Sequence, residues 1–152
     1  TYSNILIQKG SNAAVKITIP EYHQIIQSEL DTLIKENGTH RLYFIIGVPQ
    51  RSKINAYECL SRTELLGYRL IDKCSETQKK SDLQINNVLN EFSKKYSNII
   101  FINPNDFLCD KQNCLVIKNR EPIHSDQGHL SVFGAPIVLE GVLKRIQQQT
   151  QH

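Results

Sequence analysis

The sequence lacks any long apolar run: its continuous apolar segments are short, as in Leu42–Ile46 and Ile99–Ile102. About 18 consecutive apolar residues are needed to cross a bilayer, so nothing in this sequence is predicted to span a membrane. No signal peptide is visible, because Thr1-Tyr2-Ser3-Asn4 leads straight into a strand-like run. No internal repeat is present either.

Strong charge is also absent, since the formal net charge is +3. Lysine and arginine are scattered, with short pairs such as Lys79-Lys80 and Lys94-Lys95. No basic stripe is interleaved with aromatic residues, so these pairs indicate solvated helix faces, and nucleic acid is not an expected partner.

The cysteine spacing lacks the two-residue gap that is typical of zinc sites. Four cysteines allow three disulfide pairings, and the sequence alone does not choose among them. Pairing neighbours, Cys59 with Cys74 and Cys109 with Cys114, closes the shortest loops. We favour these two disulfides over zinc and over free thiols, and disulfides imply an oxidising compartment.

What is present fits one domain over residues 1–152. Apolar runs and helical stripes indicate alternating strands and helices. The predicted elements are a strand at Asn4–Ile7, a helix from Pro20 ended by Gly38, a strand at Leu42–Gly47, a short helix at Glu58–Leu66, a helix at Ile85–Tyr96, a strand at Ile99–Ile102, a loop or small hairpin at Cys109–Ile117, a last helix with Ser131 as its N-cap, and a frayed polar tail at 147–152.

This alternation predicts the α/β class, a three-layer sandwich with a parallel sheet between helices. Three strands make a thin sheet, so we expect further strands N-terminal to those found here. Ligands of such sheets bind beyond the carboxyl ends of the strands. Here those ends are the loops at Gly10–Asn12, at Pro49 and at Asn103–Asp106.

The strongest chemical signal is Asp126-Gln127-Gly128-His129, just before the last helix. A carboxylate three residues from an imidazole can fix the ring tautomer and stabilise the imidazolium that forms when the ring takes a proton. An ordinary surface turn is the alternative. His124 adds a second imidazole, but three ligands from one short turn are cramped, so we predict no metal and no cofactor.

The segment Ser125–Ala135 resembles the D-x-x-H-L-S-x-x-G-A block near the C-terminus of SGNH hydrolases. The nearest form is the SGNH domain fused to bacterial membrane acyltransferases that O-acylate surface polysaccharide. The strand that ends at Pro49, then Cys59, the Leu108-Cys109…Cys114 element and the strand Ile99–Ile102 occur in matching order. The resemblance runs from about Asn4 to Ile146.

The resemblance implies a flavodoxin-like SGNH fold, with Asp126 as the orienting acid and His129 as the general base. Gly10-Ser11-Asn12 is similar to the family's Gly-x-Asn block, whose asparagine donates to the oxyanion, so Asn12 is the oxyanion candidate. A plain polar loop after a strand is the alternative, and the aspartate that often follows this asparagine is Ala13 here.

The family's nucleophile is a serine in a Gly-Asp-Ser block, and this chain contains no Gly-Asp-Ser. We therefore interpret residues 1–152 as the C-terminal part of an SGNH domain whose missing N-terminal segment carries the serine. The chain alone is then expected to be inactive. Ser11 is the alternative nucleophile within the chain.

The resemblance implies an O-acyltransferase domain, with acetyl as the expected acyl group, which acts on an envelope polysaccharide such as lipopolysaccharide O-antigen through a serine acyl-enzyme. Its partners would be a membrane acyltransferase domain that delivers the acyl donor, and a glycan acceptor. The expected location is periplasmic or extracytoplasmic, tethered to the inner membrane through the parent protein. An SGNH carbohydrate esterase and a non-catalytic glycan-binding or partner domain are the alternatives.

Overall fold

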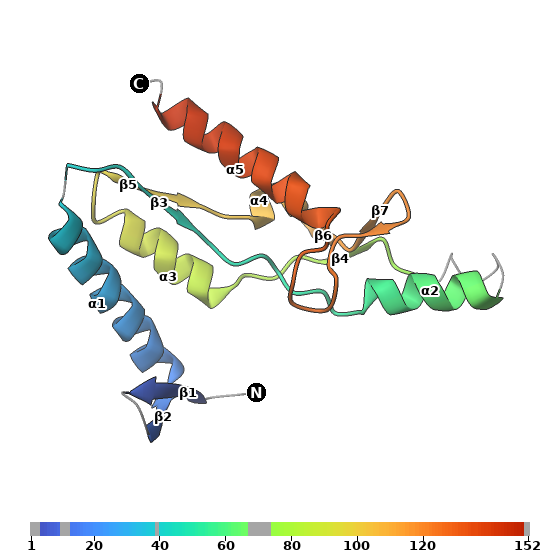
Figure 1. The fold of residues 1–152 in the computed structure, drawn as a ribbon, viewed down its shortest axis with the longest axis horizontal. Coiled ribbons are helices and arrows are strands. Elements are labelled where there is room, and N and C mark those ends of the chain that lie inside the picture. Colours follow the sequence, from blue (N-terminus) through green and yellow to red (C-terminus); the bar gives the residue numbers. More distant parts are fainter. Residues whose placement is uncertain (1–3, 10–12, 39, 67–73, 151–152) are drawn as a thin grey trace.

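A computed structural model describes residues 4–9, 13–38, 40–66 and 74–150 (Figure 1). In this part of the chain no helix is long and apolar enough to cross a membrane. The elements in chain order are β1 (Asn4–Lys9), β2 (Ala13–Thr18), α1 (Ile19–Asn37), β3 (Tyr43–Ile46), α2 (Ala56–Leu66), β4 (Thr77–Lys79), α3 (Gln84–Ser93), β5 (Ile99–Ile102), α4 (Asn105–Leu108), β6 (Asn113–Leu115), β7 (Ile117–Lys118), β8 (Glu121–Pro122) and α5 (Gly134–Thr150).

The centre of the fold is a parallel pair of strands, β3 and β5, in which Tyr43 lies opposite Ile99 and Ile46 opposite Ile102. Successive side chains of a strand point to opposite faces. Tyr43 and Ile45 accordingly pack with α1 and α3, whereas Phe44 packs with α5. Figure 1 shows α3 and α5 on opposite sides of the strand pair. Helices therefore cover both faces of this small parallel sheet.

The first predicted strand does not join that sheet, which corrects the expectation of three parallel strands. Instead, β1 pairs with β2 in an antiparallel hairpin, with Asn4 opposite Thr18 and Lys9 opposite Ala13. The sequence analysis missed β2. Its β-branched residues Val15 and Ile17 alternate with Lys16 and Thr18, a strand pattern that lies between a Gly-Ser-Asn segment and the proline of the next helix.

Helix α1 begins and ends where local chemistry dictates. Thr18 forms a capping box: its side chain accepts from the backbone N–H of Glu21, and the Glu21 carboxylate accepts from the Thr18 backbone N–H at 2.7 Å. Gly38 closes the helix with a positive φ of 93° and donates its N–H to Ile34. A side chain at such a φ is strained, so glycine suits this end.

Two disulfides join neighbouring cysteines, the pairing that the sequence analysis favoured. Cys59 is bonded to Cys74 and Cys109 to Cys114. The first bond lies in a small second core that Ala56, Cys74, Val116 and Ile117 form away from the parallel strands. It therefore ties α2 to the segment that precedes β4.

Helix α5 starts from a buried serine. The Ser131 hydroxyl accepts from the backbone N–H groups of Phe133 and Gly134 and donates to the Pro122 carbonyl. Ser131 thus caps the helix and also fastens it to β8. The helix continues to Thr150, so its last turn includes residues that the sequence analysis placed in a frayed tail.

Candidate active site

A closed turn at residues 125–129 holds Asp126 and His129 together. Two backbone hydrogen bonds, both 2.9 Å, join the segments on either side of the turn. Ser131 N donates to Ile123 O, and Ser125 N donates to His129 O. Within the turn, Oδ1 of Asp126 accepts from the backbone N–H of Gly128 at 2.5 Å and of His129 at 2.7 Å. Oδ2 lies 2.7 Å from Nδ1 of His129. Each carboxylate oxygen of Asp126 is thereby engaged.

These contacts keep Asp126 ionised. The Gly128 N–H, then the His129 ring and the His129 N–H, hold the pKa of the Asp126 carboxyl well below its usual range. A carboxylate on Nδ1 selects the tautomer in which Nδ1 carries the hydrogen and Nε2 carries a lone pair. The pair can therefore accept a proton at Nε2.

The imidazole is open to solvent. The His129 side chain is 83 % exposed and that of Asp126 is 53 % exposed. Within the described ranges, no serine, threonine or cysteine side chain hydrogen bonds to the His129 ring. The Ser125 hydroxyl is near, but it donates to the His129 backbone carbonyl at 3.3 Å and makes no hydrogen bond to the ring.

The loop that follows β3 is hydrogen-bonded to the turn and holds it in position. The Ser52 backbone N–H donates to the Gln127 carbonyl at 2.9 Å, and the Gln127 side chain reaches the Lys53 carbonyl at 3.4 Å. The Arg51 guanidinium lies close to Gly128, because a Cβ placed on that glycine would stand 3.7 Å from Arg51 Nε. The position of the turn therefore depends on the path of residues 50–53.

Buried amide side chains in turn fix that loop at the carboxyl ends of β3 and β5. Asn86, from α3, binds both backbone groups of Val48: its Oδ1 accepts from the Val48 N–H and its Nδ2 donates to the Val48 carbonyl, each at 2.8 Å. Asn105 accepts from the Gln50 N–H at 2.6 Å. Asn86 thus does what a neighbouring strand would do for Val48.

Gly47 makes this close approach possible. A Cβ at Gly47 would lie 2.7 Å from Oδ1 of Asn86 and 2.9 Å from the Phe101 ring. Gln50 continues the network, since its side chain donates to the Lys79 carbonyl and accepts from the Ser81 N–H. The sequence analysis missed Asn86, Asn105 and Gln50, because amides that pair with backbone far along the chain leave no periodic signal.

The other candidate residues of the sequence analysis are Asn12, Ser11 and His124. Asn12 and Ser11 lie outside the described residues. His124 is 2 % exposed, unlike its exposed neighbours in the turn. Within the described ranges, His124, Asp126 and His129 do not form a cluster that could hold a metal ion.

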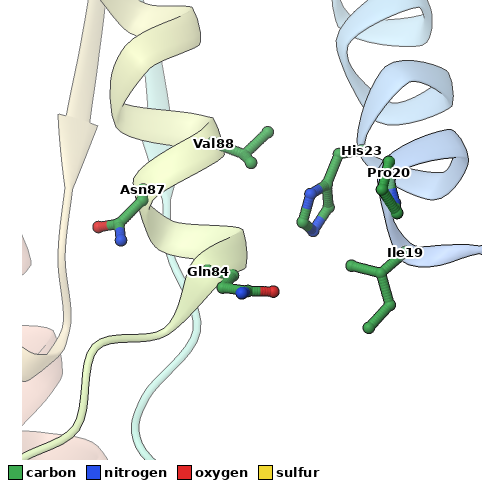
Figure 2. Close-up of a pocket in the computed structure, with 6 residues that line it drawn as sticks. All are labelled: Ile19, Pro20, His23, Gln84, Asn87 and Val88. Carbon is green, nitrogen blue, oxygen red and sulfur yellow. The ribbon is translucent and has the colours of Figure 1, made fainter. Parts of the chain in front are cut away.

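A separate cavity of about 620 Å³ lies between α1 and α3 (Figure 2). It is lined by Ile19, Pro20, His23, Gln84, Asn87 and Val88. Figure 2 shows the His23 ring directed from α1 toward α3. No residue of the turn or of the 50–53 loop lines this cavity, so we assign no chemistry to it.

Comparison with known proteins gives one family. A family model described as an SGNH domain (fused to AT3 domains) matches residues 4–143. No curated protein and no solved structure gives a significant match.

Proposed function

Because this chain belongs to the family of SGNH domains that are fused to AT3 domains, we propose that it supplies the acid–base half of a serine O-acyltransferase. The observation that carries the proposal is the 2.7 Å contact between Asp126 Oδ2 and His129 Nδ1, with the ring exposed to solvent. In this family a base of that kind is expected to activate a serine.

Each step of the proposed reaction uses the same proton acceptor. Nε2 of His129 takes the proton of the serine as its oxygen attacks the acyl carbonyl, and returns that proton to the leaving group. A sugar hydroxyl then attacks the acyl-serine, gives its proton to Nε2, and the serine oxygen leaves and is reprotonated. Asp126 remains ionised and stabilises the imidazolium in both halves.

We place the serine in a segment outside residues 1–152, and we propose that this segment adds strands to the β3–β5 pair to complete a three-layer sandwich. Parallel sheets are normally buried on both faces and have more than two strands. Ile46, at the end of β3, is nevertheless 52 % exposed, and Leu42 is 42 % exposed. Added strands, together with the helices that connect them, would cover these side chains. The chain alone should accordingly show negligible turnover of simple aryl acetates, and activity lost on Ser11→Ala would contradict this placement.

The proposed donor and acceptor are those that the family resemblance suggests. An AT3 domain in the membrane would deliver the acyl group, expected to be acetyl, to a domain on the periplasmic face. The acceptor would be an envelope glycan such as lipopolysaccharide O-antigen. A polar recess of about 670 Å³ beside β4 and β6 supports a sugar partner, since Lys79, Asp82, Lys111, Gln112 and Asn113 are among its lining residues. Asn12 remains the proposed oxyanion donor.

The test is acyl transfer to the native glycan by the full-length protein, in cells that lack the wild-type gene and express each variant equally. His129→Ala should lower transfer by a factor on the order of 10⁴ or more. Asp126→Asn should lower it by about 10⁴, because the amide favours the wrong tautomer.

The matched control is His40→Ala, an exposed histidine before the amino end of β3. It should transfer at the wild-type rate. Full activity in His129→Ala would end the proposal, and an equal loss in His40→Ala would show that the losses are not specific to the pair.

A carbohydrate esterase is the second candidate, because water could attack the same acyl-serine and give its proton to the same His129 ring. The two are separated by the fate of the acyl group. Label in the glycan identifies the transferase, and free carboxylic acid in the presence of acceptor identifies the esterase. A glycan-binding domain would give neither product and would tolerate His129→Ala.

A further inference from the structure

His124 occupies an unusual place beneath the turn. It lies opposite Leu130 in an antiparallel bridge, between the two backbone hydrogen bonds that join the two sides of the turn. His124 is 2 % exposed, and neither Nδ1 nor Nε2 makes a well-formed hydrogen bond among the described residues, although the Gln50 backbone lies near enough to act on the ring. Nearly all buried polar groups in proteins are hydrogen-bonded, so a buried imidazole whose two nitrogens make no well-formed hydrogen bond needs an explanation.

The ring is held in its neutral form. Burial lowers the pKa of His124, and the nearby Gln50 backbone and the Asp126 charge oppose this to a smaller extent. Asp126 is the charged group of the same turn that acts on the ring. Two other titratable side chains lie near the turn. Arg51, on the 50–53 loop, lies beside Gly128, and the exposed His129 ring is hydrogen-bonded to Asp126. Neither is within hydrogen-bond reach of the His124 ring.

A proton on this ring would create a buried cation, and the Gln50 backbone and the charge of Asp126 offset the cost of burial only in part. Such a charge is strongly disfavoured away from water. His124 lies in the bridge between the two backbone hydrogen bonds of the turn, with the Gln50 backbone nearby, so its ring reaches solvent only by leaving this buried position. That movement separates Ser125 N from His129 O and Ser52 N from Gln127 O, the contacts that position the turn.

We propose that His124 is a positioning residue that keeps the 125–129 turn closed while its ring is neutral, and that its protonation opens the turn and disperses Asp126 and His129. The proposal rests on the proposed function only in treating that pair as catalytic.

The pH range of the opening follows from the directions in which the pKa values of His124 and Asp126 are shifted. The folded-state pKa of His124 lies below the ordinary histidine value of about 6.5, so the closed turn is fully stable above that pH and weakens as the pH falls below it. The pKa of Asp126 also lies below its ordinary value, about 3.9, so Asp126 stabilises the turn above that pH. Opening between about pH 6.5 and 4 is therefore assigned to His124.

The experiment is amide hydrogen exchange of the full-length protein, followed at the amides of the turn from pH 7.5 to 4 and expressed as protection factors. In the wild type, the protection factors of the Ser52, Ser125 and Ser131 amides should fall about tenfold for each pH unit below about 6.5, because opening takes up one proton. In His124→Phe, which cannot take up a proton, their protection should be constant over the same range. His40→Phe should behave as the wild type does.

Constant protection in the wild type, or the same decline in His124→Phe, would overturn the proposal. If His124→Phe does not fold, His124→Gln takes its place, because it is neutral at every pH. This experiment does not measure activity. An inactive full-length protein would therefore refute the proposed function without affecting this proposal, and a negative exchange result would overturn this proposal without affecting the proposed function.

Discussion

Asn86→Ala should lower the free energy of unfolding, by an amount that can be worked out from the hydrogen bonds of the Asn86 side chain. Asn86→Ala leaves the Val48 N–H without its acceptor. The Val48 carbonyl keeps a second donor, Nδ2 of Asn105 at 3.2 Å. One backbone donor is thus orphaned in a partly buried place, which costs about 1–3 kcal/mol.

Asn87→Ala is the matched control, since it is the same substitution one residue further along α3, at an exposed position. Alanine favours a helix over asparagine by about 0.5 kcal/mol, and this gain applies to both variants and cancels in their difference. The difference in unfolding free energy should therefore be about 2 kcal/mol. With a urea m-value of about 2 kcal/mol/M, the two midpoints should differ by about 1 M.

Urea unfolding followed by circular dichroism measures this difference, and thermal unfolding should show a gap of about 4–8 °C in Tm. The full-length Asn86→Ala protein should also transfer less acyl group at temperatures where it remains folded, because the 50–53 loop no longer holds the turn in one place. Equal midpoints for Asn86→Ala and Asn87→Ala would refute the reasoning that an amide replaces a strand partner for Val48.

Two further substitutions test the packing around the site. Gly134→Ala should destabilise the chain by about 1–3 kcal/mol despite the better helix propensity of alanine, because its Cβ would lie 2.0 Å from the Ile123 carbonyl oxygen. Gly128→Ala, whose Cβ would meet nothing nearer than 3.7 Å, should have little effect, and a larger loss there than at Gly134 would contradict the geometry. For the disulfides, the Cys59→Ala/Cys74→Ala double variant should lose about 3 kcal/mol, since the bonded residues are 15 apart. Cys109→Ala/Cys114→Ala, with a separation of 5, should lose about 2 kcal/mol, and denaturant unfolding without reductant that gave the reverse order would count against the chain-entropy account.

The sequence predicted elements that have strong periodicity or clear end signals. The apolar run at Ile99–Ile102 is β5, and the stripe from Ile85 belongs to α3. Gly38 ends α1, as its lack of a side chain suggested. The family assignment from the Ser125–Ala135 block is confirmed by the match over residues 4–143.

Long-range pairing was less accessible. Whether β1 pairs with β2 or joins β3 depends on contacts with the rest of the fold, which a short apolar run does not specify. Residues 113–115 pair with Thr77–Lys79 as β6 and β4, although their own sequence suggested only a loop or small hairpin. The spacing of Asp126 and His129 suggested their contact, but the burial of His124 beside them was not predictable, because residues of one short turn can face opposite ways.

The serine of the His129-Leu130-Ser131 motif is occupied by structural hydrogen bonds. Ser131 is 4 % exposed, and its hydroxyl donates to the Pro122 carbonyl and accepts from the Phe133 and Gly134 N–H groups. A reactive serine needs a free lone pair and room for the acyl group, and Ser131 has neither. A fluorophosphonate probe should therefore leave this peptide unmodified even in the active full-length protein. A labelled peptide recovered by mass spectrometry would then come from another part of the protein and would locate its nucleophile directly.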